Sequence, residues 1–95
     1  MQKIQNLNRT IDRIIEMEEI FDMLLEILEK NPAAVKTDVV LKEKLEKLVQ
    51  YYESGLWLAD FEQDERGMFP VGLKRGILSE DGIYNFLSKI QDFSQ

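Results

Sequence analysis

Four acidic residues that lie close together are the first feature of this sequence that could do chemistry: Asp60, Glu62, Asp64 and Glu65. Carboxylate oxygens are the ligands that Mg²⁺ and Ca²⁺ prefer, and Asp60 and Asp64 would lie one turn apart on a helix. The run lacks the glycine and the alternating oxygen ligands of an EF-hand loop. We therefore expect the exposed side of a short helix here, and no bound metal.

A second acidic set comprises Glu16, Glu19, Glu26 and Glu29. Glu-x-x-Glu pairs on facing helices hold Mg²⁺ in some all-helical nucleotide hydrolases, so a metal-dependent nucleotide hydrolase is the alternative hypothesis. Such a site needs matching carboxylates on the next helix, and residues 42–47 there mix Lys with Glu. Exposed helix charge is the favoured interpretation.

The residue types that catalysis uses most are absent, because the chain has no His and no Cys. The first absence removes the commonest general base and metal ligand. The second removes thiolate nucleophiles, disulfides and Cys-based zinc sites. We predict no catalytic residue and no cofactor, and favour a non-enzymatic role.

Basic and acidic side chains meet again where Lys74 and Arg75 precede Ser79, Glu80 and Asp81. A helix start with basic neighbours could bind an anion. Ser79 is a good N-cap, and the two acids that follow it suit the positive end of the helix dipole. Because those acids would repel an added anion, we do not expect a phosphate site.

Two interpretations of this segment remain open. In one, Lys74 or Arg75 forms an ion pair inside the chain and holds the loop on the preceding helix; the candidate partners are Asp60, Glu62 and Asp81. In the other, the segment binds another protein. Aromatic residues are common in interfaces and in small cores, so the full candidate set is Tyr51, Trp57, Asp60, Lys74, Arg75, Ser79, Glu80 and Asp81.

Helices are expected to position these residues. Apolar side chains recur every three or four positions over residues 3–30, which predicts one helix about 40 Å long. That length exceeds the roughly 30 Å diameter of a small domain. Its first turns must therefore fray or be covered, and pairing of two copies through Ile4, Leu7 and Ile11 would give a homodimer.

The remaining elements are predicted to be helical too. Asn31-Pro32 ends the first helix, the pattern resumes near residue 38, and the short link predicts an antiparallel helical hairpin. Asn31 and Asp38 are both candidate caps for the second helix. Ser54 is expected to cap a third helix over Leu56–Glu65.

The C-terminal part completes the predicted architecture. Residues 67–78 form a Gly/Pro-rich connection that carries apolar anchors, and a last helix begins after Ser79, with Leu78 and Ile83 placed as a hydrophobic staple. We predict an all-α fold, a small helical bundle in one domain over residues 1–95. Its parts are a long hairpin over 1–54 and two shorter helices over 55–95.

Charge and hydropathy limit the partners. The formal net charge is −6, which disfavours duplex nucleic acid and anionic membrane surfaces. The N-terminal sequence does not resemble a secretory signal, and no apolar stretch approaches the roughly 20 residues of a membrane span. We expect a cytoplasmic protein.

Specific residues in the C-terminal half resemble a known family. The strings are Tyr51-Tyr52-x-Ser54-x-x-Trp57-x-x-Asp60-Phe61-Glu62, then Pro70-x-x-Leu73-Lys74-Arg75-Gly76-Ile77-Leu78-Ser79-Glu80-Asp81, then Tyr84-x-x-Leu87, with Arg13-Ile14-x-x-Met17-Glu18 near the start. This pattern is similar to DUF4298, a family of short acidic bacterial proteins of unknown function. The resemblance implies a small helical fold and carries no activity, substrate or catalytic residue.

The leading functional hypothesis is therefore a non-catalytic protein-interaction or structural module. Its partner would be an unidentified protein or a second copy of the chain, without nucleic acid, membrane, cofactor or metal.

Overall fold

The computed structural model describes the backbone of residues 2–93 and the side chains of residues 7–90. Over that range the regular structure is helical: α1 (Gln2–Lys30), α2 (Pro32–Thr37), α3 (Val39–Glu53), α4 (Leu56–Glu65), the 3₁₀ turn η1 (Gly76–Leu78) and α5 (Glu80–Phe93). The predicted all-α class and small helical bundle are confirmed.

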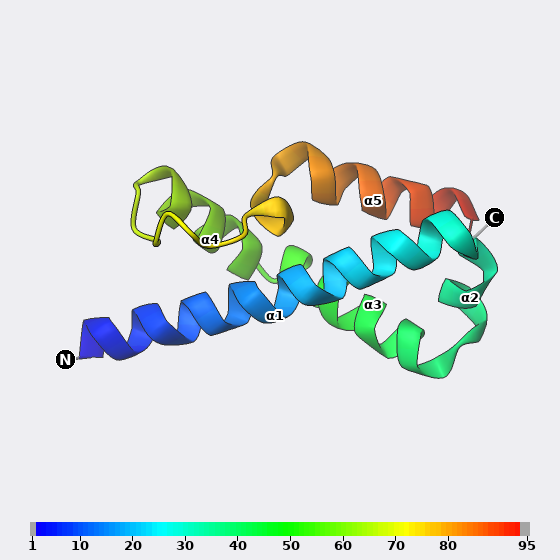
Figure 1. Ribbon diagram of the computed structural model, residues 1–95, viewed down its shortest axis with the longest axis horizontal. Helices are drawn as coiled ribbons and strands as arrows, with labels where there is room; N and C mark the ends of the chain where they lie inside the picture. Colours follow the sequence, from blue (N-terminus) through cyan, green and yellow to red (C-terminus); the bar gives the residue numbers. More distant parts are fainter. Residues whose placement is uncertain (1, 94–95) are drawn as a thin grey trace.

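Helix α1 determines the shape of the molecule. The overall extents are 46 × 24 × 23 Å, and the long dimension follows α1, whose N-terminal turns project beyond the other helices (Figure 1). Helix α3 lies on one side of α1, while α4, η1 and α5 lie on another. None of the helices in the described range has the length and apolar character needed to cross a bilayer.

The connection between α1 and α3 differs from the expected short link, because it forms the additional helix α2. Pro32 stands at the start of α2, where its fixed φ suits a helix and its missing N–H costs nothing. Val35 of α2 is buried. Asn31 makes no side-chain cap, whereas Asp38 Oδ1 accepts from the N–H groups of Val40 at 2.9 Å and Leu41 at 3.2 Å, so Asp38 caps α3.

The start of α4 also differs in detail. Helix α4 spans the predicted Leu56–Glu65, but its N-cap is Gly55, whose φ of 94° is readily adopted only by glycine. Ser54 instead ends α3, and its Oγ accepts from the N–H of Leu56 at 3.3 Å. The expected cap of α5 is present, since Ser79 Oγ accepts from the N–H of Gly82 at 3.4 Å.

One continuous core joins these helices. Its centre holds Ile14, Leu24, Leu48, Ile77, Ile83 and Phe86, each at most 1% exposed. Phe21 of α1 packs edge-to-face on Phe86 of α5, with ring centroids 5.5 Å apart. Trp57 stacks on Phe61 at 5.2 Å. Since α1 contributes to the core along much of its length, it is the surface on which both halves of the chain assemble.

Candidate functional site

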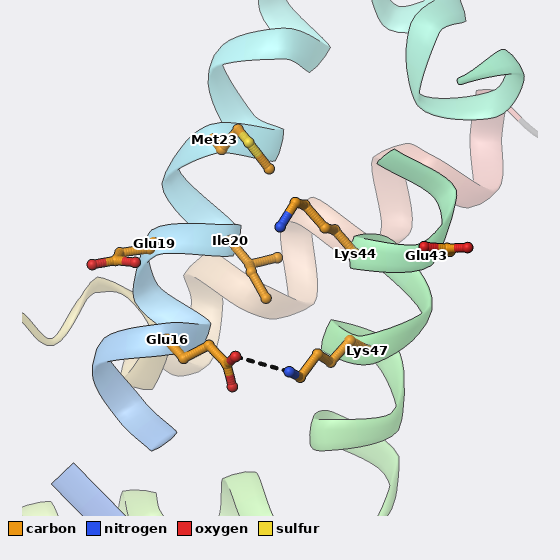
Figure 2. Close-up of a pocket in the computed structure, with 7 residues that line it drawn as sticks. All are labelled: Glu16, Glu19, Ile20, Met23, Glu43, Lys44 and Lys47. Carbon is orange, nitrogen blue, oxygen red and sulfur yellow. Dashed lines mark hydrogen bonds and ion pairs between the residues drawn. The ribbon is translucent and has the colours of Figure 1, made fainter. Parts of the chain in front are cut away.

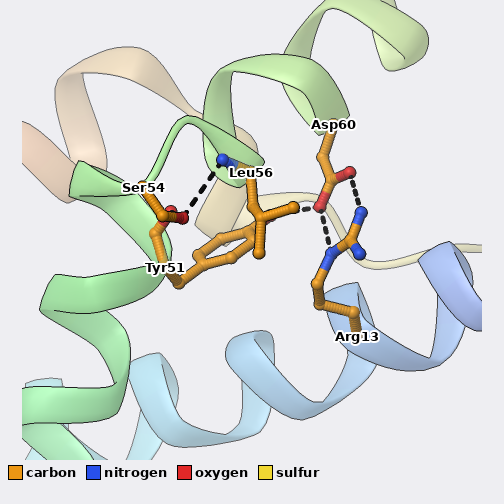
Figure 3. A network of polar contacts seen from close by, with 5 residues as sticks. All are labelled: Arg13, Tyr51, Ser54, Leu56 and Asp60. Atoms are coloured by element: carbon orange, nitrogen blue, oxygen red, sulfur yellow. Dashed lines mark hydrogen bonds and ion pairs between the residues drawn. The ribbon is translucent and has the colours of Figure 1, made fainter.

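A buried carboxylate joins the two halves of the chain. Asp60 of α4 is 1% exposed, and its two oxygens accept from Arg13 Nε at 3.0 Å and Arg13 Nη2 at 2.5 Å. The Tyr51 hydroxyl donates to Asp60 Oδ2 at 2.7 Å. Figure 3 shows the carboxylate between the guanidinium of α1 and the phenol of α3. We call Arg13, Tyr51 and Asp60 the Asp60 network; it satisfies a buried charge with a bidentate partner.

The protonation states in the Asp60 network suit a structural contact between helices better than proton transfer. Burial, together with donation to Asp60, raises the pKa of Tyr51 far above its ordinary value, so the phenol stays protonated. The hydrogen bond to Asp60 raises the pKa of Arg13 as well. Neither group changes its charge near neutral pH, so neither is suited to acid–base catalysis.

The Ile77 peptide is held on both sides by distant side chains. Glu18 of α1 accepts from the Ile77 N–H at 2.6 Å, and the Trp57 indole N–H donates to the Ile77 carbonyl at 2.8 Å. Gly76 allows this approach, because a Cβ there would lie 2.9 Å from a Glu18 oxygen. These contacts fix η1 between α1 and α4.

Glu18 is a site residue that the sequence analysis missed. It is only 7% exposed although it belongs to a helix rich in exposed acids. Burial is the main cause that raises its pKa; the Ile77 N–H opposes this, the nearby Asp22 adds to it, and Lys74 counteracts it. The available signal was its place between Met17 and Phe21, on the buried side of α1.

Arg75 joins its own loop to α4. Its Nε donates to Asp64 of α4 at 2.6 Å, and its Nη groups donate to the carbonyls of Leu73 and Pro70 at 2.8 Å each. The expected partners Asp60, Glu62 and Asp81 were wrong: Asp60 pairs with Arg13, and Asp64 pairs with Arg75. The reason is geometric, because Asp60 faces α1 while Asp64, one turn later, lies beside the loop.

The other predicted site residues lie apart from these contacts. Lys74 is exposed and lines a groove of about 310 Å³, together with Glu18, Glu19 and Asp22. Ser79, Glu80 and Asp81 are exposed at the start of α5. The structure thus unites Tyr51, Trp57, Asp60 and Arg75 in contacts within the chain and leaves the acidic start of α5 in solvent.

A second groove separates α1 from α3. One part, of about 420 Å³, is lined by Glu16, Glu19, Ile20, Met23, Glu43, Lys44 and Lys47. An adjoining part of about 330 Å³ shares Glu16 and Lys47 and continues to Leu56. Figure 2 shows Ile20 and Met23 of α1 facing α3 across this space, with the Glu16–Lys47 ion pair of 2.8 Å below them. We call it the α1/α3 groove.

A protein-family model matches most of the chain, including most of the residues in the contacts described above. The family model described as "Domain of unknown function (DUF4298)" matches residues 14–94. The chain belongs to the DUF4298 family. The matched range begins next to Arg13 and includes Glu18, Tyr51, Trp57, Asp60 and Arg75. No curated protein and no solved structure shows significant similarity to the chain.

In this DUF4298 protein the candidate metal-binding acids are dispersed. Asp60 and Asp64 pair with different arginines, Glu16 pairs with Lys47, and Glu26 pairs with Lys30. Among the residues that the structure describes, no group of three or more acidic side chains is arranged to hold a metal ion. The arrangement offers contacts that hold helices together and a groove, and the groove is what a ligand could occupy.

Proposed function

We propose that this protein is a non-catalytic protein-interaction module that acts as one helical domain in the bacterial cytoplasm. The contrast between two parts of the molecule carries the proposal. The buried polar groups of the Asp60 network and of the Ile77 contacts are all engaged within the chain, while the α1/α3 groove keeps apolar side chains between charged edges.

The chemistry of the groove supports a protein ligand. Interfaces combine apolar contact surface with a polar rim, and methionine adapts to irregular partners. Here Ile20 and Met23 supply the apolar part, and Glu16 and Lys47 supply part of the rim. Buried polar side chains elsewhere in the described range have hydrogen-bond partners, which supports a rigid surface around the groove.

The proposed partner is an unidentified protein or a second copy of the chain, and the sequence predicts the first turns of α1 as the surface for the second case. The N-terminal turns of α1 project from the body (Figure 1), and the sequence pattern suggested pairing through Ile4, Leu7 and Ile11. Leu7 and Ile11 are half-buried against the core of their own chain, and the Ile4 side chain lies outside the described residues. Little apolar surface is left for a partner at the described part of these turns.

Site-specific photo-crosslinking in the native host tests the interaction role. A photoreactive residue at Gln50, which is exposed in the α1/α3 groove, should give discrete protein adducts. The matched control carries the same residue at Asn85, exposed on α5. Equal adducts at both positions, or none at Gln50, would contradict the proposal.

Turnover measurements test the non-catalytic part. The purified protein with Mg²⁺ or Mn²⁺ should leave a panel of nucleoside di- and triphosphates unhydrolysed. Hydrolysis that disappears when Glu16 and Glu19 are replaced by Gln would instead establish the metal-dependent hydrolase.

A further inference from the structure

A short bend links the part of the chain that ends with α3 to the part that begins with α4. Helix α3 ends at Glu53 and α4 begins at Leu56. Ser54 already has helical backbone angles, with φ −73° and ψ −13°, whereas Gly55 is left-handed, with φ 94° and ψ −9°. A change chiefly in φ at Gly55 would therefore join α3 and α4 into one helix over residues 39–65, about 40 Å long.

The part of the chain after the bend, residues 56–93, has contacts of its own, and we call it the C-terminal half. The Trp57 indole donates to the Ile77 carbonyl at 2.8 Å, and Arg75 donates to Asp64 at 2.6 Å. Both contacts join residues of the same half. The C-terminal half can therefore move about the bend as one body.

The contacts between the two halves join residues that are far apart in the sequence. They are an ion pair, a hydrogen bond and a ring contact: Arg13 with Asp60, Glu18 with the Ile77 N–H, and Phe21 with Phe86. Neither the pairing nor the packing involves the residues of the bend. The same contacts would form equally well if the two halves came from different copies of the chain.

A straightened chain would not keep these contacts within itself. Figure 3 shows Tyr51 of α3 and Asp60 of α4 facing each other across the bend, where they form a hydrogen bond. On a continuous helix they would lie about 13 Å apart along the axis, and the bond would be lost. Core side chains such as Phe21 and Phe86 would also face water. The straight form therefore requires a second copy of the chain.

We infer that Gly55 is the hinge of a domain exchange, in which two copies trade their C-terminal halves. Each copy then has a straight α3–α4 helix, and its C-terminal half packs on α1 of the other copy. The contacts between the halves are regained twice, about a two-fold axis and without any new surface. Glycine adopts a left-handed φ readily, so Gly55 lets the wild type close on itself. This inference does not rest on a ligand in the α1/α3 groove.

The test is Gly55→Ala in the full chain. A Cβ at residue 55 would meet nothing within 4 Å, so the substitution acts through the backbone: it disfavours the left-handed bend and favours a continuous helix. At low micromolar concentration, light scattering should give a mass of 11.2 kDa for wild type and twice that mass for Gly55→Ala. The helical circular dichroism of the variant should match that of wild type.

Gly67→Ala is the matched control. Gly67 also has a positive φ, 73°, and a Cβ there would meet nothing within 4 Å, but Gly67 lies inside the C-terminal half. This variant has a comparable backbone strain without a changed hinge, and it should remain monomeric. If Gly67→Ala dimerises as Gly55→Ala does, association follows from general loss of stability and the inference fails.

Isotope-filtered NMR distinguishes an exchanged dimer from one formed by surface contacts. Labelled and unlabelled chains of Gly55→Ala are mixed, unfolded in urea and refolded together. The rings of Phe21 and Phe86 are buried, with centroids 5.5 Å apart, so an exchanged dimer should give nuclear Overhauser effects between these rings across the two chains. A dimer formed by surface contacts keeps the ring pair within one chain and gives none.

A folded Gly55→Ala that is monomeric at high micromolar concentration would overturn the inference, as would a dimer without the interchain signal between Phe21 and Phe86. If Gly55→Ala does not fold, labelled and unlabelled wild type are refolded together from urea at high micromolar concentration. A dimeric fraction with the interchain signal then supports the exchange, and a product that is entirely monomeric contradicts it.

Discussion

The two sides of α1 are held to the rest of the chain in different ways. On the side of α4 and η1, the contacts use side chains that are nearly inaccessible: Asp60 is 1% exposed and Trp57 is 6% exposed. On the α3 side, the Glu16–Lys47 pair joins two side chains that are each 51% exposed. Water competes with the second polar contact and hardly with the first, so we expect the polar contacts on the α4 side to contribute more to stability. Leu48 and Tyr51 of α3 are buried as well, and what stays accessible on the α3 side is the α1/α3 groove.

Removal of the Trp57 side chain should weaken the contacts that hold α4 to the rest of the chain. Trp57→Ala removes the stacking on Phe61 and the hydrogen bond to the Ile77 carbonyl, and we expect a loss of about 3–5 kcal/mol in the free energy of unfolding. Urea denaturation followed by circular dichroism measures it. Leu58→Ala, at a neighbouring exposed position, should cost about 0.5 kcal/mol or less. Similar losses for both would show that α4 is not held through Trp57.

Loss of one charge in the Asp60 network should have the next largest effect. Asp60→Asn keeps the shape but leaves the Arg13 guanidinium, 29% exposed, without its counter-ion. We expect a loss of about 2–4 kcal/mol, near the lower end of values for broken buried pairs because water still reaches Arg13. Asp81→Asn changes the same charge at an exposed position and should stay within about 0.5 kcal/mol of wild type. Equal effects would mean that the burial of Asp60 is unimportant.

The sequence predicts the helices from local signals but does not predict which side chains pair. Local signals placed α4 at Leu56–Glu65 and began α5 after Ser79, because breaks, caps and spacing act over a few residues. Asp64 as the partner of Arg75 was not recoverable, since carboxylates one turn apart on a short helix look alike until the loop is placed. The α2 helix was missed because Pro32 reads equally well as an end or a beginning.

Glu18 shows the same limit for a functional position. The composition of α1 suggests that every glutamate on it faces water, and the contact with the Ile77 N–H joins residues 59 positions apart. The helical position of Glu18 beside Met17 and Phe21 distinguishes it from the exposed Glu19, but the group that Glu18 contacts is defined only by the packing of η1 on α1. Long-range contacts of this kind have no local pattern, so the Ile77 contacts could not be predicted.

Two substitutions of Glu18 separate the contribution of its hydrogen bond to Ile77 from the contribution of its charge. Glu18→Ala leaves the Ile77 N–H without its acceptor and should cost about 1–3 kcal/mol. Glu18→Gln keeps an acceptor oxygen and should cost much less at pH 7. Urea denaturation of both variants at the same pH measures the difference. If alanine and glutamine cost the same, the hydrogen bond to Ile77 contributes nothing.

The pH dependence of the Glu18→Gln comparison follows from the raised pKa of Glu18. The folded state retains the proton of Glu18 more strongly than the unfolded chain does. This favours folding below the ordinary value of 4.5 and is lost as the pH rises through the folded-state pKa. Wild type should therefore lose stability relative to Glu18→Gln as the pH rises from the ordinary value of 4.5 through the raised folded-state pKa. The opposite trend would mean that the Ile77 N–H outweighs burial.

The smallest expected effect is on the α3 side. A double-mutant cycle with Glu16→Gln and Lys47→Met should give a coupling of about 0.2–1 kcal/mol, because both side chains are half in water. Added salt should remove it, whereas the coupling between Arg13 and Asp60 should persist in salt, since a buried pair is screened less. The cycle is measured at low protein concentration, so that association does not contribute. A large, salt-resistant coupling here would mean that the α1/α3 groove is closed by its own ion pair, and then neither the difference between the two sides of α1 nor a binding role for that face would hold.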